Sequence, residues 1–178
     1  GGLNAGALHL AAGSFVIDRS VFQSNTSLIG TGAVTVSSTS DGAVISNSLF
    51  VGNALTQLSL GDGDYTLANL TMFDNDGQPD LRGFDGATFT IFNTIADFPS
   101  SPTNGIPAAG GTNLESSADL FVNAANGDFR PVLASGAIDG GGGEGVGEDV
   151  TGAPRGVGAG VDIGAFEVPL PATLANLD

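Results

Sequence analysis

The stretch Ile45-Ser46-Asn47-Ser48-Leu49-Phe50-Val51-Gly52-Asn53 decides the fold, because related segments precede and follow it at nearly even spacing. The related segments are Ile17–Asn25, Leu67–Asn75 and Ile91–Pro99. A repeat of roughly 25 residues is typical of a solenoid, in which each copy buries its apolar face against its neighbours. The sequence therefore predicts a coil of stacked repeats.

Alignment of the four copies gives columns of small or apolar residues. The columns are Phe15, Ala43, Tyr65 and Phe89; Ile17, Ile45, Leu67 and Ile91; Ser20, Ser48, Leu70 and Thr94; and Phe22, Phe50, Met72 and Ala96. The first two columns lie two positions apart, as in a strand with one buried face. The second and third lie three apart, which requires a bend. We therefore expect short strands that turn corners and stack in parallel, an all-β fold of the β-solenoid type.

Asparagine recurs at the predicted bends and is interpreted as structural. The bend falls at Arg19, Asn47, Asn69 and Asn93, and a second column contains Asn25, Asn53 and Asn75. Asparagine tolerates the left-handed backbone conformation, and its amide can bond to the next amide along the stack. We expect ladders of amides here, and an internal stack of Phe22, Phe50 and Met72.

The repeat predicts four sections of chain. Regular rungs are expected over 1–98. They end there because Pro99 replaces the ladder asparagine and lacks an N–H for the next rung. A stretch rich in Pro, Ser and Gly then predicts a loop or linker over 99–118. Residues 119–168 are expected to close the coil, and 169–178 to form an extended tail.

Composition excludes several classes of partner. The chain has 19 acidic residues against 4 basic ones, a net charge of −15. Nucleic acid is not expected as a partner, because phosphate binding needs clusters of Lys or Arg. There is no cysteine for disulfides or thiolate metal sites. No apolar stretch is long enough for a transmembrane helix.

The repeats and the tail together resemble a known family. The tail segments are Asp119-Leu120-Phe121-Val122, Asn126-Gly127-Asp128-Phe129-Arg130-Pro131, Ser135-Gly136-Ala137-Ile138-Asp139-Gly140, Thr151-Gly152-Ala153-Pro154-Arg155 and Val161-Asp162-Ile163-Gly164-Ala165-Phe166-Glu167. Their order resembles the C-terminal portion of right-handed parallel β-helix (pectate-lyase-like) surface proteins of the choice-of-anchor Q type. The resemblance implies a right-handed coil, an irregular C-terminal closing segment and an extracellular or cell-surface location. It leaves the activity open, because one fold hosts many functions.

The first repeats lack the N-terminal cap of such proteins. An uncapped solenoid end exposes strand edges and core side chains. We expect either that more protein precedes Gly1 or that this end docks on a partner, with a homo-oligomer or fibre as one outcome. A structural, adhesive or assembly module of this kind is the favoured function. The alternatives are a non-catalytic portion of a carbohydrate-active β-helix enzyme and a polysaccharide-binding module.

No catalytic residue is predicted. The single histidine, His9, lies in an apolar strand-like stretch, and the chain has no lysine to serve as a base. Asp62, Asp64, Asp74 and Asp76 could form a cluster of carboxylates, but the paired motifs of polysaccharide hydrolases are absent. The sequence favours a chain without catalysis of its own.

Calcium is the one cofactor that the sequence suggests. Asp74, Asp76 and Asp80 alternate with Asn and Gly as in a calcium loop, and Asp85 could approach from the next turn. The competing interpretation is an acidic loop between rungs.

The tail contains further charged residues, which we interpret as structural. Arg155 and Asp162 are expected to form a buried or half-buried ion pair beside the apolar tail segments. Glu144, Glu148 and Asp149 fall in a glycine-rich stretch that predicts a solvated loop.

Overall fold

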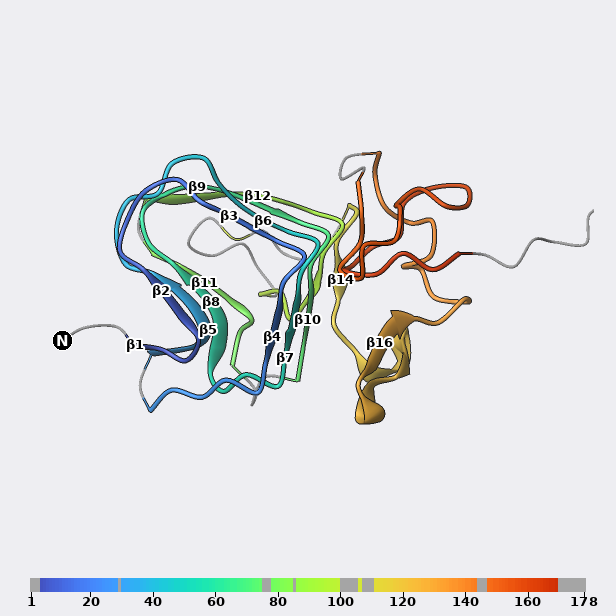
Figure 1. Cartoon of the computed structure of the whole chain (residues 1–178), viewed down its shortest axis with the longest axis horizontal. Helices are drawn as coiled ribbons and strands as arrows, with labels where there is room; N and C mark the ends of the chain where they lie inside the picture. The colour runs from blue at the N-terminus through green and yellow to red at the C-terminus, as the bar shows by residue number, and fades with distance from the viewer. Residues whose placement is uncertain are drawn as a thin grey trace, which may run out of the picture.

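The computed structural model describes residues 4–28, 30–74, 78–84, 86–99, 106, 111–143 and 147–169. Within them the chain forms a parallel β-solenoid of about 3 turns, which confirms the predicted all-β fold class. Each coil passes through three sheets in the same order before the next coil begins. Figure 1 looks along the coil, so the strands of successive coils lie behind one another.

All three sheets are parallel and gain one strand per coil. The first sheet contains β1 (Asn4–Ala5), β2 (Leu8–Leu10), β5 (Gly30–Val36), β8 (Thr56–Leu60) and β11 (Leu81–Gly83). The second contains β3 (Val16–Asp18), β6 (Ala43–Ser46), β9 (Gly63–Ala68) and β12 (Ala87–Phe92). The third contains β4 (Val21–Gln23), β7 (Leu49–Val51), β10 (Thr71–Phe73), β13 (Ile95–Ala96) and β14 (Leu114–Glu115).

The observed register is that of the aligned repeats. Ile17 pairs with Ile45, Ile45 with Leu67, and Leu67 with Ile91. A slip by one residue would turn every one of these side chains to the other face of its sheet, so burial of one face specifies the register.

Apolar side chains from all three sheets fill the interior of the coil. Leu58 of the first sheet, Leu67 of the second and Phe50 of the third belong to one cluster and are fully buried. The rings of Phe22 and Phe50 stack with centroids 4.8 Å apart and planes 7° apart. The phenylalanine column is thus an internal stack, as expected.

The C-terminal segment covers the side of the coil. Two 3₁₀ helices, η1 (Ala118–Leu120) and η2 (Ala124–Asn126), flank β15 (Phe121–Asn123), which pairs antiparallel with β16 (Asp128–Pro131). Neither helix is long or apolar enough to cross a membrane, and the described residues contain no other helix. Figure 1 shows this segment in yellow to red, outside the third sheet.

The outer face of the third sheet explains this position. Leu49, Val51 and Ile95 point away from the interior and form a second hydrophobic cluster with Phe121 and Phe129. Because residues alternate between the faces of a strand, these three lie opposite the buried core column. Residues 119–168 are expected to close the coil, and the members of this section in the second cluster pack on the flank of the third sheet, which is apolar on both faces.

The predicted loop over 99–118 also contributes to the coil. Its strand β14 pairs with β13, with Leu114 beside Ile95. The side chain of Asn113 accepts a hydrogen bond of 3.1 Å from the Thr94 backbone, and Ile106 is buried in the main core at 2% exposure. The third sheet therefore continues one strand beyond the regular rungs.

Candidate functional site

The first asparagine column stands at the corner between the second and third sheets. Asn47, Asn69 and Asn93 have φ angles of 47°, 53° and 51°, and Arg19 has 48°. The Asn69 side-chain nitrogen donates to Asn47 Oδ1 over 3.1 Å. The Asn93 side chain donates to the Gly142 carbonyl over 3.2 Å and accepts from the Gly142 N–H over 2.8 Å. The left-handed corners and these bonds give the column a structural role.

The second asparagine column follows the third sheet. Asn25 donates to Asn53 Oδ1 over 2.7 Å, and Asn53 donates onward to the carbonyl of Phe22 over 2.9 Å. The left-handed corner lies one position earlier, at Ser24, Gly52 and Asp74. Asn75, the third expected member of the ladder, lies outside the described residues.

Two of the four predicted calcium ligands can be placed. Asp74 and Asp80 line one pocket together with Asp97, and the Asp97 N–H donates to Asp80 Oδ2 over 2.6 Å. Asp76 and Asp85 lie outside the described residues. Within the described ranges, no group of three or more His, Asp or Glu side chains is arranged to hold a metal ion. Calcium binding here stays a prediction.

A glutamate beside this pocket has a perturbed acidity. Burial raises the pKa of Glu115, and the neighbouring carboxyl of Asp97 raises it further. Two carboxyls at close range favour the protonated form of one of them.

Arg155 binds a different partner from the one predicted. Its Nη1 lies 3.7 Å from Glu167 Oε2, its Nη2 donates to the Gly164 carbonyl over 2.9 Å, and its Nε donates to Asn47 Oδ1 over 2.9 Å. Burial lowers the pKa of Arg155, against the opposing effect of nearby carboxylates, of which Glu167 is the strongest. The expected pairing with Asp162 is therefore replaced by one with Glu167.

The Asp162 carboxylate accepts hydrogen bonds from backbone N–H groups. It accepts from Asp139 over 2.8 Å and from Val168 over 2.7 Å. Burial raises the pKa of Asp162, these backbone bonds lower it, and the charge of Glu167 raises it again, with a raised pKa as the net result. Asp162 thus connects the backbone at Asp139 to the backbone at Val168 within the C-terminal segment.

Asp149 is a structural residue that the sequence analysis missed. Instead of lying in a solvated loop, it is 2% exposed and accepts backbone N–H groups from Thr151, Ala153 and Glu167. Burial alone would raise the pKa of Asp149, but these bonds and the Thr151 hydroxyl bring it below its ordinary value. The spacing of Asp149 and Thr151, typical of a turn closed by an aspartate side chain, was the available signal.

Neighbouring Glu148 joins the C-terminal segment to the first coil. It forms an exposed ion pair with Arg19. Glu144, the third acidic residue of the predicted loop, lies outside the described residues.

The remaining candidate residues lie near a surface pocket between the first and second sheets. We call it the Gly61 pocket, and its lining residues are Val36, Ser37, Ser38, Thr39, Gly61, Asp62 and Phe84. His9 is exposed beside it, with Nε2 3.0 Å from Ser37 Oγ. Asp62 and Asp74 line different pockets. The structure therefore does not bring these two carboxylates together in one cluster.

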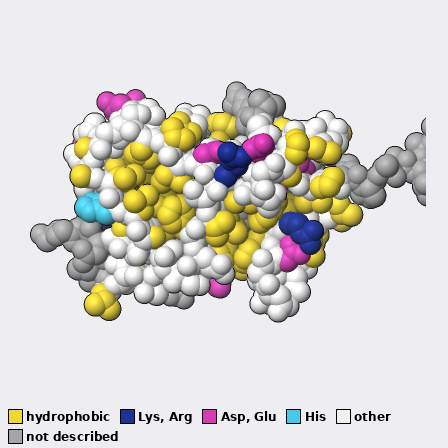
Figure 2. Space-filling view, in the orientation of Figure 1, with side chains coloured by type: hydrophobic (Ala, Val, Ile, Leu, Met, Phe, Trp, Pro, Cys, Tyr) yellow, Lys and Arg dark blue, Asp and Glu magenta, His cyan; other side chains and the backbone are white. Residues whose placement is uncertain are grey.

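A second candidate is the end of the solenoid formed by β2, β3 and β4, which we call the first-coil edge. Each of these strands is outermost in its sheet, and no described strand pairs with its free side. Figures 1 and 2 look onto this end, where hydrophobic side chains gather on the surface.

No protein-family model, curated protein or solved structure matches the chain. The fold and these surfaces define the protein as a parallel β-solenoid with a laterally packed C-terminal segment.

Proposed function

We propose that the chain is a structural assembly module of an extracellular or cell-surface protein, related to the pectate-lyase-like β-helices and of the choice-of-anchor Q type. In this proposal a rigid solenoid associates end to end with a second copy through the first-coil edge. The observation that carries the proposal is that, among the described residues, all three sheets end in an outermost strand at the same end of the coil. Backbone N–H and C=O groups on such strands are templates for pairing with another chain.

Core side chains are accessible at this end. Leu8, Leu10, Phe15 and Phe22 are only partly buried, whereas Phe50, directly beneath Phe22 in the next coil, is fully buried. Removing partly exposed apolar surface from water favours association by roughly 25 cal/mol per Å², and the entropic cost of association opposes this gain. The first-coil edge therefore offers backbone pairing and apolar contact together.

The opposite end of the coil is covered in part by the chain that follows. Phe98 and Ile106 are buried in the main core, and the Asn113 side chain donates to the Ile91 carbonyl over 2.9 Å. Because that end is partly capped, we propose contact between two first-coil edges, related by a two-fold axis. Two-fold dimers are the commonest symmetric assemblies, and their interface is self-complementary.

Charge modulates this association. Two chains that each carry a net charge of −15 repel one another, and added salt screens the repulsion between exposed charges. We therefore expect the dimer to be favoured at high ionic strength. Calcium could also favour the dimer, by neutralising carboxylates. Comparing dimer formation with and without calcium at the same ionic strength separates this effect from screening.

The test is analytical ultracentrifugation of the full chain over a range of concentration and salt. The variant Val16→Lys/Val21→Lys places charges on the outer faces of β3 and β4, where these valines are 70% and 57% exposed. Charged residues on an edge strand block pairing. The matched control, Val122→Lys/Val157→Lys, makes the same change at exposed valines of the C-terminal segment, which are 51% and 40% exposed.

We expect the unmodified chain and the control to dimerise, and the edge variant to stay monomeric with an unchanged thermal melting temperature. A chain that stays monomeric at every concentration and salt would refute association through this end. Open filaments would show head-to-tail stacking and refute the two-fold arrangement.

A further inference from the structure

The Gly61 pocket arises from unequal turns in successive coils. Residues 37–42 separate β5 from β6, whereas only Gly61 and Asp62 separate β8 from β9. The N–H of Gly61 donates to the Val36 carbonyl, and the N–H of Phe84 donates to the Leu60 carbonyl, so the three turns stack in register. The short turn at Gly61 and Asp62 lies between the longer turn that follows β5 and the turn that follows β11. The surface is recessed at this short turn.

Glycine at position 61 permits this close stacking. A Cβ atom added to Gly61 would lie 3.1 Å from the Val36 carbonyl oxygen and 3.2 Å from the backbone N and O of Ser38. The turn of the preceding coil therefore lies directly over a position without a side chain. A side chain at position 61 would require that turn to shift by a few tenths of an ångström, so glycine favours the close stacking seen here.

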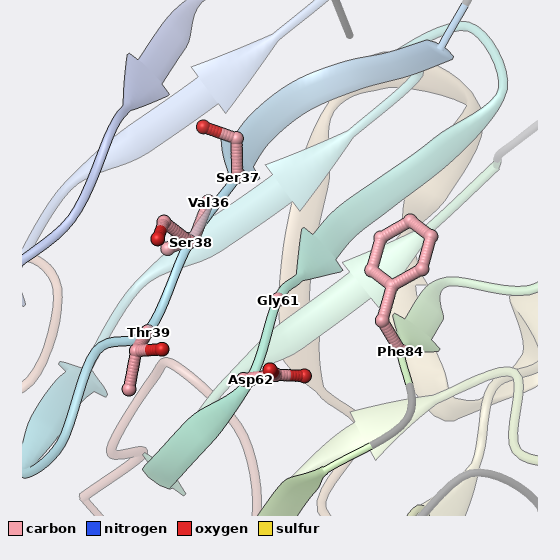
Figure 3. A pocket seen from close by; sticks show the side chains of 7 residues that line it. All are labelled: Val36, Ser37, Ser38, Thr39, Gly61, Asp62 and Phe84. Atoms are coloured by element: carbon pink, nitrogen blue, oxygen red, sulfur yellow. The ribbon is translucent and has the colours of Figure 1, made fainter.

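The walls of the pocket are chemically distinct. Figure 3 shows the Phe84 ring on one side, Ser38 and Thr39 on the other, and the Asp62 carboxylate between them. The Arg82 guanidinium lies 5.2 Å from the centroid of the Phe84 ring, a cation–π contact that holds the ring in position. The pocket thus combines a fixed aromatic face, hydroxyl groups and one carboxylate.

These groups select for a neutral ligand that is rich in hydroxyls. The described lining residues contain one acidic side chain and no basic one, and the nearby Arg82 guanidinium lies against the Phe84 ring, so the charge of Asp62 disfavours an anionic ligand. A carboxylate only accepts hydrogen bonds, whereas serine and threonine hydroxyls both donate and accept. The aromatic face packs against apolar C–H groups.

We propose that the Gly61 pocket binds a neutral saccharide unit, whose C–H face packs on Phe84 and whose hydroxyls donate to Asp62 and exchange hydrogen bonds with Ser38 and Thr39. The pocket lies on the side of the coil and uses none of the residues substituted in the association test. The two proposals can therefore fail separately.

The test is a titration of the ¹⁵N-labelled full chain, followed by amide chemical shifts. The probes are a fixed panel of neutral oligosaccharides, cellotetraose, xylotetraose and mannotetraose, with tetragalacturonate as the anionic counterpart. We expect at least one neutral probe to shift the amides of Ser38, Gly61 and Asp62 saturably, with weaker shifts from tetragalacturonate. The monomeric edge variant can carry the same titration if association broadens the spectra.

Two variants connect the shifts to the pocket. Phe84→Ala and Asp62→Asn should each weaken binding by about tenfold, because each removes a principal contact while leaving the coil in place. Asp64→Asn is the matched control on β9, since its carboxylate is exposed and bonds Thr88 instead. It should bind as the unmodified chain does.

Three results would overturn the proposal: no shift with any neutral probe at 20-fold excess over millimolar protein, shifts that persist unchanged in Phe84→Ala, or tighter binding of tetragalacturonate. Retained amide dispersion in each variant verifies that a loss of binding does not reflect unfolding.

Discussion

Arg155 Nε donates a hydrogen bond of 2.9 Å to Asn47 Oδ1, which joins the C-terminal segment to the second coil. The same asparagine oxygen accepts from Asn69 of the third coil over 3.1 Å. The segment that covers the flank of the solenoid is thus attached to the ladder that builds its corner. Stability of the flank and of the coil should be coupled through Arg155.

We expect Arg155→Met to lower the free energy of unfolding by about 3–5 kcal/mol, because it leaves Glu167 buried without its counter-charge. The side chains of both residues are almost fully buried, so solvent cannot compensate. Urea denaturation followed by circular dichroism measures the change. Arg130→Met is the control, because the exposed Arg130–Asp128 pair should contribute less than about 1 kcal/mol. Equal stability of the two variants would contradict the interpretation.

Substitutions at Asn69 separate backbone conformation from ladder bonding. Asn69→Ala and Asn69→Gly both remove the side-chain bond to Asn47, but glycine adopts the left-handed conformation at φ 53° without steric cost. Asn69→Ala should therefore be less stable than Asn69→Gly by about 1 kcal/mol. Chemical denaturation of the pair measures the difference. An alanine variant at least as stable as the glycine variant would show that the conformation contributes little.

Phe50→Ala should create a cavity in the interior stack and cost about 3–5 kcal/mol of unfolding free energy. Phe50 is fully buried and stacks on Phe22. Calorimetric melting measures the loss. Val122→Ala, at an exposed position of β15, should change stability by less than about 0.5 kcal/mol. A loss at Phe50 no larger than that at Val122 would mean that the stack is not a packed core.

Acid should destabilise the C-terminal segment through Asp149. Its pKa is lower in the folded state than in the unfolded chain, so its stabilisation is present above about pH 4 and is lost as the pH falls toward the folded-state pKa. Asp149→Asn should lower stability at pH 7 and flatten the decline of stability as the pH falls below about 4. Melting temperatures across this range measure the effect. A variant that keeps the full acid-dependent decline would assign that decline to other carboxyls.

The repeat alone predicted most of the solenoid. The pairing of Ile17 with Ile45 and the corners at Asn47 and Asn69 could be derived because an identical local environment recurs in every coil. A residue at a fixed position of the repeat contacts the residues at the same position in the neighbouring coils. The repeat in the sequence therefore predicts these tertiary contacts directly.

Residues outside the repeat were harder to interpret. Asp149 resembled part of a flexible acidic loop, because its glycine-rich context gives no periodic signal and its partners Ala153 and Glu167 are backbone donors. The charge partner of Arg155 was likewise ambiguous. Several carboxylates follow it in sequence, and only packing decides which of them lies within reach.

The sequence by itself determined a parallel β-solenoid, its register and its asparagine corners, because these follow from a repeated alternation of apolar and polar residues. The tertiary structure alone decided that the C-terminal segment packs on the flank of the third sheet, that Arg155 pairs with Glu167, and that the Gly61 pocket opens between unequal turns. Each of these depends on contacts between segments without a common repeat, whose geometry is set by the shape and burial of the folded chain.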